Sequence, residues 1–197
     1  MSSQNNSIPK SLSIGLGGNI NSPIGPPELT LIKAKPYIEQ VINVWTDTFL
    51  ESNGSKNSLN LGVDLKINFH WSPLYLTEPI GGPKGQPNFV NAALVAEGGE
   101  LEKLNPSVLA AKDLLKRFLE IEKMFGRDRS NASIHWGPRS LDIDFLSWGN
   151  LKVQSSELTL PHPRLSERDF VIIPLAEALQ KKSNRPIKIS PQHGWED

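Results

Sequence analysis

The chain of 197 residues contains no cysteine and carries a formal net charge of zero, and both absences narrow its possible functions. Without cysteine it cannot form disulfide bonds, thiolate zinc sites or a cysteine nucleophile. Its 21 basic and 21 acidic residues give no excess of positive charge, which argues against a nucleic-acid-binding protein that relies on a broad basic surface. A local cluster of arginines is still compatible with this balance.

The sequence also lacks the apolar segments that target proteins to membranes or anchor them there. No apolar run approaches the ~18 residues of a membrane-spanning helix. Residues 1–10 are rich in serine and asparagine and have no apolar core like that of a secretory signal, so we expect a disordered lead-in there. These features predict a cytoplasmic protein that binds neither membranes nor nucleic acids.

The length and a hydrophobic content of 38% predict one domain over residues 11–197. Apolar patterns predict strands at 11–17, 61–69, 74–76, 89–97 and around 141–145. A helix is expected at 27–45, where Pro36 kinks or divides it. A second is expected at 107–125, with Ser107 as its N-cap and Gly126 at its end. Residues 169–179 resemble a short helix. The order strand, helix, strand, strand, helix, strand matches an α+β ferredoxin-like sandwich, a mostly antiparallel sheet with helices packed on it.

The segment 136–145, WGPRSLDIDF, places two carboxylates two residues apart among apolar neighbours. In a strand, Asp142 and Asp144 point to one face and the apolar residues around them point to the other. Like charges side by side repel unless a cation lies between them, and Mg²⁺ prefers one or two carboxylates together with substrate phosphates. Arg139 can hold a phosphate bidentately. The alternative is a solvated strand face with two exposed carboxylates.

Further basic residues flank this segment. Arg127 and Arg129 follow the end of the second predicted helix, and together with Arg139 they offer cations for a triphosphate whose metals the aspartates would bind. His162 is fixed between two prolines, which suits a phosphate contact but equally suits a structural turn. A solvated charge cluster is the alternative for the arginines.

A third group combines an aromatic ring with an amide. Phe89 and Asn91 share one face of the predicted strand at 89–97, and such a pair can hold a flat nitrogen heterocycle. A core phenylalanine beside an edge asparagine is the alternative interpretation. The chain contains neither a Walker-A sequence nor a kinase glycine-rich loop with His-Arg-Asp, so any phosphate chemistry lies outside those two classes.

Together these segments resemble the 6-hydroxymethyl-7,8-dihydropterin pyrophosphokinase family of folate biosynthesis. The resemblance covers about residues 11–180 and is most specific where WGPRxLDxD is followed by PHPRxxxRxF. The matching segments are LGGN (16–19), YLTEPIG (75–81), QPNFVNAAL (86–94), IEKMFGRDR (121–129), WGPRSLDIDFLSWGN (136–150) and LTLPHPRLSERDFVIIPL (158–175).

The resemblance implies that the β,γ-pyrophosphate of ATP moves to the pterin hydroxymethyl oxygen and that AMP is released. Asp142 and Asp144 would hold two Mg²⁺ ions, and Arg127 and Arg139 would neutralise charge on the transferred group. The implied ATP-binding residues are Glu122, Arg129, Trp136, Arg139, His162 and Arg168. The implied pterin-binding residues are Thr77, Glu78, Ile80, Phe89, Asn91, Trp136 and Phe170.

The resemblance further implies a monomer and a mobile loop around Trp136 that closes over both substrates. Relative to the family pattern, residues 46–70 look like an insertion, Gly18 stands where serine is commoner, and His135 stands where an arginine is often found. Two other functions are compatible with the sequence: a non-catalytic pterin- or nucleotide-binding protein of the same fold, and a ferredoxin-like RNA-binding module. The zero net charge and the missing RNP sequence disfavour the second.

Overall fold

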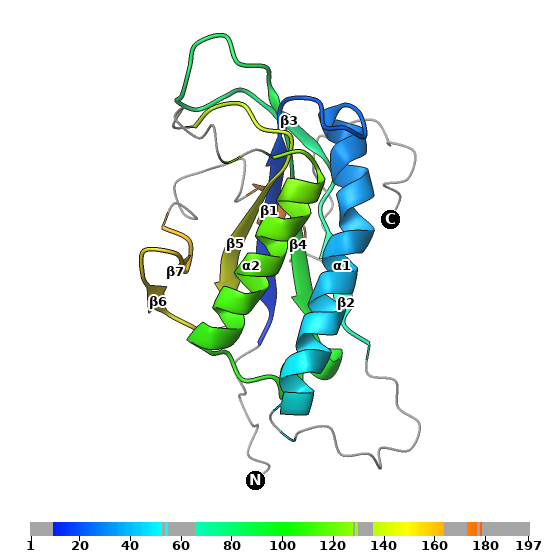
Figure 1. Cartoon of the computed structure of the whole chain (residues 1–197), viewed down its shortest axis with the longest axis vertical. Helices are drawn as coiled ribbons and strands as arrows, with labels where there is room; N and C mark the ends of the chain where they lie inside the picture. Colours follow the sequence, from blue (N-terminus) through cyan, green and yellow to red (C-terminus); the bar gives the residue numbers. More distant parts are fainter. Residues whose placement is uncertain are drawn as a thin grey trace.

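The computed structural model of the chain describes residues 10–52, 54, 66–127, 129, 136–163, 173–176 and 178. In this part, two long helices lie side by side on one face of an antiparallel sheet (Figure 1). The elements are β1 (Leu12–Gly18), α1 (Pro27–Ser52), β2 (Asn68–Trp71), β3 (Tyr75–Thr77), β4 (Phe89–Glu97), the 3₁₀ helix η1 (Gly99–Lys103), α2 (Val108–Met124), β5 (Asp142–Trp148), β6 (Val153–Gln154) and β7 (Thr159–Leu160). The predicted α+β class and antiparallel sheet are confirmed.

The sheet has the strand order β2-β4-β1-β5, and β3 also pairs with β4. All these pairings are antiparallel. The register sets Gly17 of β1 opposite Asn91 of β4 on one side and opposite Asp142 of β5 on the other. Directly opposed residues project to the same face of a sheet, so the amide and the first aspartate lie on one face with only a glycine between them.

The core fills the space between this sheet and the two helices. Helix α1 contributes a buried stripe that includes Ile38, Ile42 and Trp45, and α2 contributes Leu114 and Phe118. The Trp45 indole donates a hydrogen bond to the Ala110 carbonyl at 3.0 Å, which ties α1 to the first turn of α2. Because side chains of this size each contribute roughly 1.5–3 kcal/mol on burial, this layer fixes both helices against the sheet.

Helix α1 corrects two sequence-based predictions. It runs unbroken through Pro36 and ends at Ser52 rather than at residue 45, so the expected division at Pro36 is wrong. Pro36 is exposed, and water can therefore satisfy the carbonyl that loses its hydrogen bond, while buried Ala34 and Ile38 hold the helix on both sides. The apolar stripe continues through buried Leu50, beyond the stretch that we identified from the sequence.

The other elements agree more closely with expectation. Strand β4 has the predicted limits, and the Ser107 hydroxyl caps α2 by accepting the Ala110 N–H. An edge strand was expected at 61–69, and the observed strand β2 begins at Asn68. Residues 66–67 do not belong to the sheet, and residues 61–65 lie outside the described part of the chain. Residues 1–9 and most of the helix expected at 169–179 also lie outside them. Among the described residues, none of the helices combines the length and apolarity needed to cross a membrane.

Candidate active site

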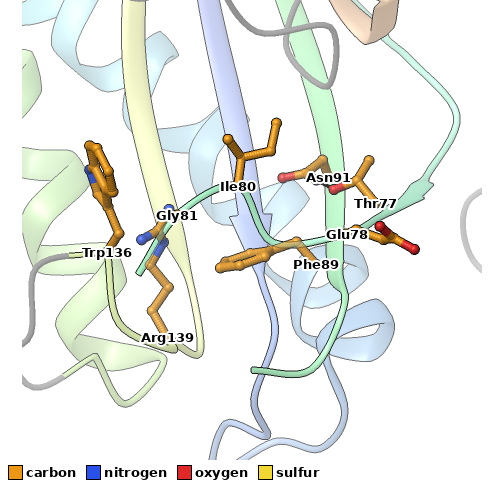
Figure 2. Close-up of a pocket in the computed structure, with 8 residues that line it drawn as sticks. All are labelled: Thr77, Glu78, Ile80, Gly81, Phe89, Asn91, Trp136 and Arg139. Carbon is orange, nitrogen blue, oxygen red and sulfur yellow. Dashed lines mark hydrogen bonds between the residues drawn. The ribbon is translucent and has the colours of Figure 1, made fainter. Parts of the chain in front are cut away.

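A first cavity opens between β3, β4 and the segment that leads into β5 (Figure 2). Its volume is about 40 Å³, and it is lined by most of the residues predicted to bind the pterin. In Figure 2, Trp136 stands at one end of the cavity, Thr77 and Asn91 stand at the other, and Arg139 and Phe89 lie between them. The lining residues are Thr77, Glu78, Ile80, Gly81, Phe89, Asn91, Trp136 and Arg139.

Asn91 forms the polar end of this cavity. Its side chain is buried, and its amide donates a hydrogen bond of 2.7 Å to the Thr77 hydroxyl, which fixes the orientation of the amide. Gly17 lies directly beneath it, and a Cβ at that position would stand only 2.7 Å from the Asn91 Oδ1. Asn91 can therefore take this position only because residue 17 is a glycine.

Trp136 forms the other end, in a backbone conformation that is uncommon for a residue with a side chain. Its φ is 57°, and its ring lies over Gly81, where an added Cβ would meet the ring at 2.6 Å. The Trp136 carbonyl accepts a hydrogen bond of 3.0 Å from Gln86, which also contacts the amide of Asn19 at 3.4 Å. Sequence reasoning assigned no individual role to Gly81, Gln86 or Asn19, although all three lie in segments that match the family pattern.

A second, larger cavity of about 660 Å³ lies along the edge of β5 that faces away from β1. It is bounded by α2 and by the β6–β7 hairpin, which stands beside β5 (Figure 1). Lys112 of α2 and Glu157 between β6 and β7 form an ion pair of 2.8 Å that joins the two walls. The lining residues are Leu115, Leu119, Arg127, Arg129, Trp136, Arg139, Asp142, Ile143, Asp144, Phe145, Ser155, Ser156, Glu157, Leu158, Thr159, His162 and Pro163.

Asp142 is held by two arginines. Its Oδ1 accepts a hydrogen bond of 2.5 Å from Arg127 Nη1, and its Oδ2 lies 2.8 Å from Arg139 Nε. The second contact is an ion pair without hydrogen-bond geometry, because the buried Nε of Arg139 has no aligned acceptor. Asp144 lies on the same face of β5, while Ile143 and Phe145 are buried, as the alternation predicts.

Glu122 lies behind this pair rather than at a cavity wall. Its carboxylate is 1% exposed and accepts the Ile143 backbone N–H at 2.8 Å, at the peptide between the two aspartates. Arg129 Nε donates to the other oxygen at 3.1 Å, and Arg127 Nε lies 3.6 Å from that oxygen. Burial raises the pKa of Glu122, the charge of Asp142 raises it further, and Arg127 opposes both effects.

The raised pKa gives a stability prediction for Glu122→Gln. The folded state holds this proton more tightly than the unfolded chain, so the stabilisation exists at low pH and is lost as the pH rises above the ordinary value of 4.5. At neutral pH the charged carboxylate therefore lowers the free energy of unfolding. We expect the free energy of unfolding of the variant to be higher than that of the parent protein, or lower by no more than about 1 kcal/mol. Removing one partner from a net-stabilising buried pair costs roughly 3–5 kcal/mol instead.

Urea unfolding at several pH values measures this difference. The stability of the variant relative to the parent protein should rise with pH above 4.5. Glu120→Gln, at an exposed position of the same helix, is the matched control and should show no such trend. A loss of several kcal/mol at neutral pH for Glu122→Gln alone would contradict the prediction.

The donor set at Asp142 and Asp144 fits a hard divalent cation. Two carboxylates on one strand face offer oxygen ligands, and the cavity in front of them holds arginines that suit phosphate. The described residues contain no group of three or more acidic or histidine side chains that could hold a metal ion by itself. Mg²⁺ commonly takes its remaining ligands from water and phosphate, so the pair suits that ion.

Most of the predicted site residues are thus close together, in two adjoining cavities. Arg168 and Phe170 lie outside the described residues. The predicted ATP residues Arg129, Trp136 and His162 line the second cavity, where the His162 backbone N–H donates to the Leu146 carbonyl at 2.8 Å. Sequence reasoning also missed the apolar part of this cavity, for which the only signal is a pair of leucines, at 115 and 119, one helical turn apart on α2.

Comparison with known proteins adds an independent finding. The sequence profile of the 7,8-dihydro-6-hydroxymethylpterin-pyrophosphokinase family matches residues 13–180. A folate synthesis bifunctional protein of Arabidopsis thaliana is 35% identical over 153 residues, which cover 77% of this chain and 29% of the relative.

Two bacterial proteins named 2-amino-4-hydroxy-6-hydroxymethyldihydropteridine pyrophosphokinase are also similar. The protein of Synechocystis is 32% identical over 120 residues, 61% of this chain and 53% of the relative. The protein of Helicobacter pylori is 36% identical over 105 residues, 53% of this chain and 58% of the relative. The chain therefore spans between about a third and somewhat more than half the length of these curated relatives.

Proposed function

Because the chain belongs to the 7,8-dihydro-6-hydroxymethylpterin-pyrophosphokinase family, we propose that it transfers the β,γ-pyrophosphate of ATP to 6-hydroxymethyl-7,8-dihydropterin, a step of folate biosynthesis. The hydroxymethyl oxygen forms a bond to the β-phosphorus and loses its proton. The bond between that phosphorus and the oxygen bridging to the α-phosphate breaks, and AMP leaves. The observation that carries the proposal is that Trp136 and Arg139 line both cavities, so an acceptor in one adjoins a donor in the other.

The first cavity is the proposed pterin site. Phe89 offers an aromatic face for the ring, and the Asn91 amide offers a donor and an acceptor for its edge. Thr77 fixes that amide, while Glu78 and Ile80 line the open side, where Ile80 is 71% exposed. Phe170 is proposed as the second aromatic face, on the strength of the family pattern alone.

The second cavity is the proposed ATP site. The leucines of α2 and the β6–β7 hairpin form a partly apolar region that suits a nucleobase. Arg127, Arg129, Arg139 and His162 line the part that suits the phosphates, and Arg168 joins them by the family pattern. Glu122 is proposed to act indirectly, by supporting Arg127, Arg129 and the peptide between the aspartates.

Asp142 and Asp144 are proposed to hold Mg²⁺, two ions by the family pattern. The metal would offset the negative charge of the phosphates. No general base is proposed, because this reaction class does not require one. Phosphoryl transfer depends mostly on positioning and on charge stabilisation, which the arginines here can supply.

Four further expectations accompany this proposal. The order β2-β4-β1-β5, with both long helices on one face, supports a ferredoxin-like sandwich. Movement of the segment around Trp136 would exclude water from the joined cavities, which favours transfer to the pterin over hydrolysis. A monomeric state and a cytoplasmic location are also proposed, by the family pattern.

The direct test is an assay of the purified chain with ATP, 6-hydroxymethyl-7,8-dihydropterin and Mg²⁺. We expect AMP and the pterin pyrophosphate to appear in equal amounts, with no inorganic phosphate. Tight binding of both substrates without AMP formation would instead identify the non-catalytic alternative. Salt-sensitive RNA affinity in a filter-binding assay, without binding of either substrate, would support the RNA-binding module.

The close approach of Gly17 to Asn91 gives a prediction for Gly17→Ala. The new methyl group would displace the Asn91 amide, since only 2.7 Å separates its position from Oδ1. We expect the KM for the pterin to rise about tenfold, the cost of one misplaced hydrogen-bonding group, with little change in the KM for ATP. Steady-state kinetics with each substrate varied in turn measures this.

Gly15→Ala is the matched control on the same strand. A Cβ there would meet its nearest neighbour, Leu146, at an ordinary 3.6 Å. If the KM for the pterin rises equally in the two variants, the rise comes from adding a methyl group anywhere on β1 and not from displacement of Asn91.

A further inference from the structure

Arg139 stands at the junction of the two cavities and makes one contact in each. Its guanidinium lies over the Phe89 ring, with the central carbon 5.0 Å from the ring centroid. Its Nε lies 2.8 Å from Asp142 Oδ2. Under the proposed function, these are the surfaces that the substrates require, since the pterin stacks on Phe89 and the metal binds Asp142.

We propose that Arg139 gates both sites in the nucleotide-free protein. It occupies the stacking face of Phe89 and the outer oxygen of Asp142, and the phosphates of a bound nucleotide draw it away from both. A single side chain thereby makes the binding of the pterin and of a divalent cation depend on the nucleotide. This inference rests on the proposed function, because it assigns one cavity to each substrate.

The release of Arg139 leaves no buried charge unpaired. Asp142 keeps Arg127 on its other oxygen at 2.5 Å, so the carboxylate remains neutralised when Arg139 departs. Arg127 also donates to the Leu141 carbonyl at 3.0 Å, which holds it at the strand independently of Arg139. The freed Oδ2 is then available to a cation.

The contacts that Arg139 leaves are weaker than those it would gain. The ion pair with Asp142 lacks hydrogen-bond geometry, and the buried Nε has no aligned acceptor. A phosphate offers several anionic oxygens and accepts two parallel N–H bonds from a guanidinium. The stacking on Phe89 is an attraction between a cation and a neutral ring, which a phosphate outcompetes for the same cation.

The test measures binding without nucleotide, where gating and ordinary ligand contacts predict opposite signs. Calorimetry gives the Kd of 6-hydroxymethylpterin, and electron paramagnetic resonance gives the Kd of Mn²⁺, for the parent protein and for Arg139→Ala. We expect Arg139→Ala to bind both about threefold or more tightly, because the side chain that blocks each surface is gone. If Arg139 serves only as a ligand contact, the variant will bind the pterin more weakly, and the inference is overturned.

Two further variants complete the design. Arg117→Ala removes an arginine of α2 that pairs with Asp113 at 2.7 Å outside both cavities, and it should leave both Kd values unchanged. Arg139→Gln, which retains a polar side chain, replaces Arg139→Ala if the latter lacks a native circular dichroism spectrum, with the same tightening expected.

A second series adds α,β-methylene-ATP with Mg²⁺ and separates the two levels of the proposal. In the parent protein we expect the pterin to bind about tenfold or more tightly with the nucleotide, and in Arg139→Ala we expect this ratio to approach one. A parent protein that binds no pterin even with the nucleotide would refute the proposed function. A parent protein that binds both, together with a variant whose ratio is unchanged, would refute only the gating role of Arg139.

Discussion

Asp142→Asn is expected to lower kcat for AMP formation by about a thousandfold, or roughly 4 kcal/mol of transition-state stabilisation. The substitution removes a proposed metal ligand and also the anion that neutralises Arg127 and Arg139. Both losses act where charge moves between phosphate oxygens, so the effect should exceed that of a typical substrate contact. Quenched-flow or coupled measurement of AMP release provides the test.

Asp113→Asn is the matched control for this variant. Asp113 also pairs with an arginine, Arg117, at 2.7 Å, but on α2 and away from both cavities. It should retain kcat within about a factor of two, since exposed helix pairs contribute little. If Asp142→Asn has a native circular dichroism spectrum and its kcat falls by less than tenfold, the proposed role of this carboxylate is contradicted.

The second large effect is expected at Arg127, which donates both to the Leu141 carbonyl and to Asp142. Arg127→Met should lower kcat by about a thousandfold, within the range that a charge-stabilising arginine contributes to phosphoryl transfer. Arg127→Lys keeps the charge but loses the planar fork, and about a hundredfold loss is expected. The comparison of the two variants separates charge from geometry.

Arg117→Met serves as the control, because it removes an ion-paired arginine that lies outside the cavities. The KM for ATP should change less than kcat in both Arg127 variants, since the proposed contact strengthens as charge develops. A change confined to KM would instead identify Arg127 as a residue that only anchors the nucleotide.

The sequence was sufficient where structure depends on local periodicity. The alternation around Asp142 and Asp144 placed both on one strand face, and the same reasoning set Phe89 beside Asn91. The capping serine of α2 was equally predictable, because a cap depends on its immediate neighbours. These features need only the side-chain geometry of a single strand or helix.

The sequence was insufficient where contacts join distant segments. Nothing local shows that Arg139 reaches Phe89, fifty positions earlier in the chain, since that contact depends on how β5 and β4 flank β1. Nor does local composition reveal that Gln86 bonds to the Trp136 carbonyl. For Pro36, tertiary packing of α1 outweighs an intrinsic preference that favoured a break.

Glu122 is an intermediate case. The resemblance associated it with the nucleotide, whereas in the structure its carboxylate supports β5 and two arginines from behind. A signal was present, because Phe118, Ile121 and Glu122 lie on one apolar stripe of α2 and a charge there must be buried. The partners of that charge depend on long-range pairing and could not be identified from the stripe.

The backbone of Arg139 has a consequence for the speed of the gate. Asn19 accepts its N–H at 2.8 Å, and the Asn19 N–H donates to its carbonyl at 2.9 Å, so the peptide on each side of the arginine is clamped. Moving the guanidinium therefore requires only rotation about side-chain bonds, which takes on the order of nanoseconds for accessible rotamers. Such a swing is far quicker than the turnover of phosphoryl-transfer enzymes, on the order of 1–100 per second. The slow step of the catalytic cycle should accordingly lie elsewhere, in backbone rearrangement or product escape.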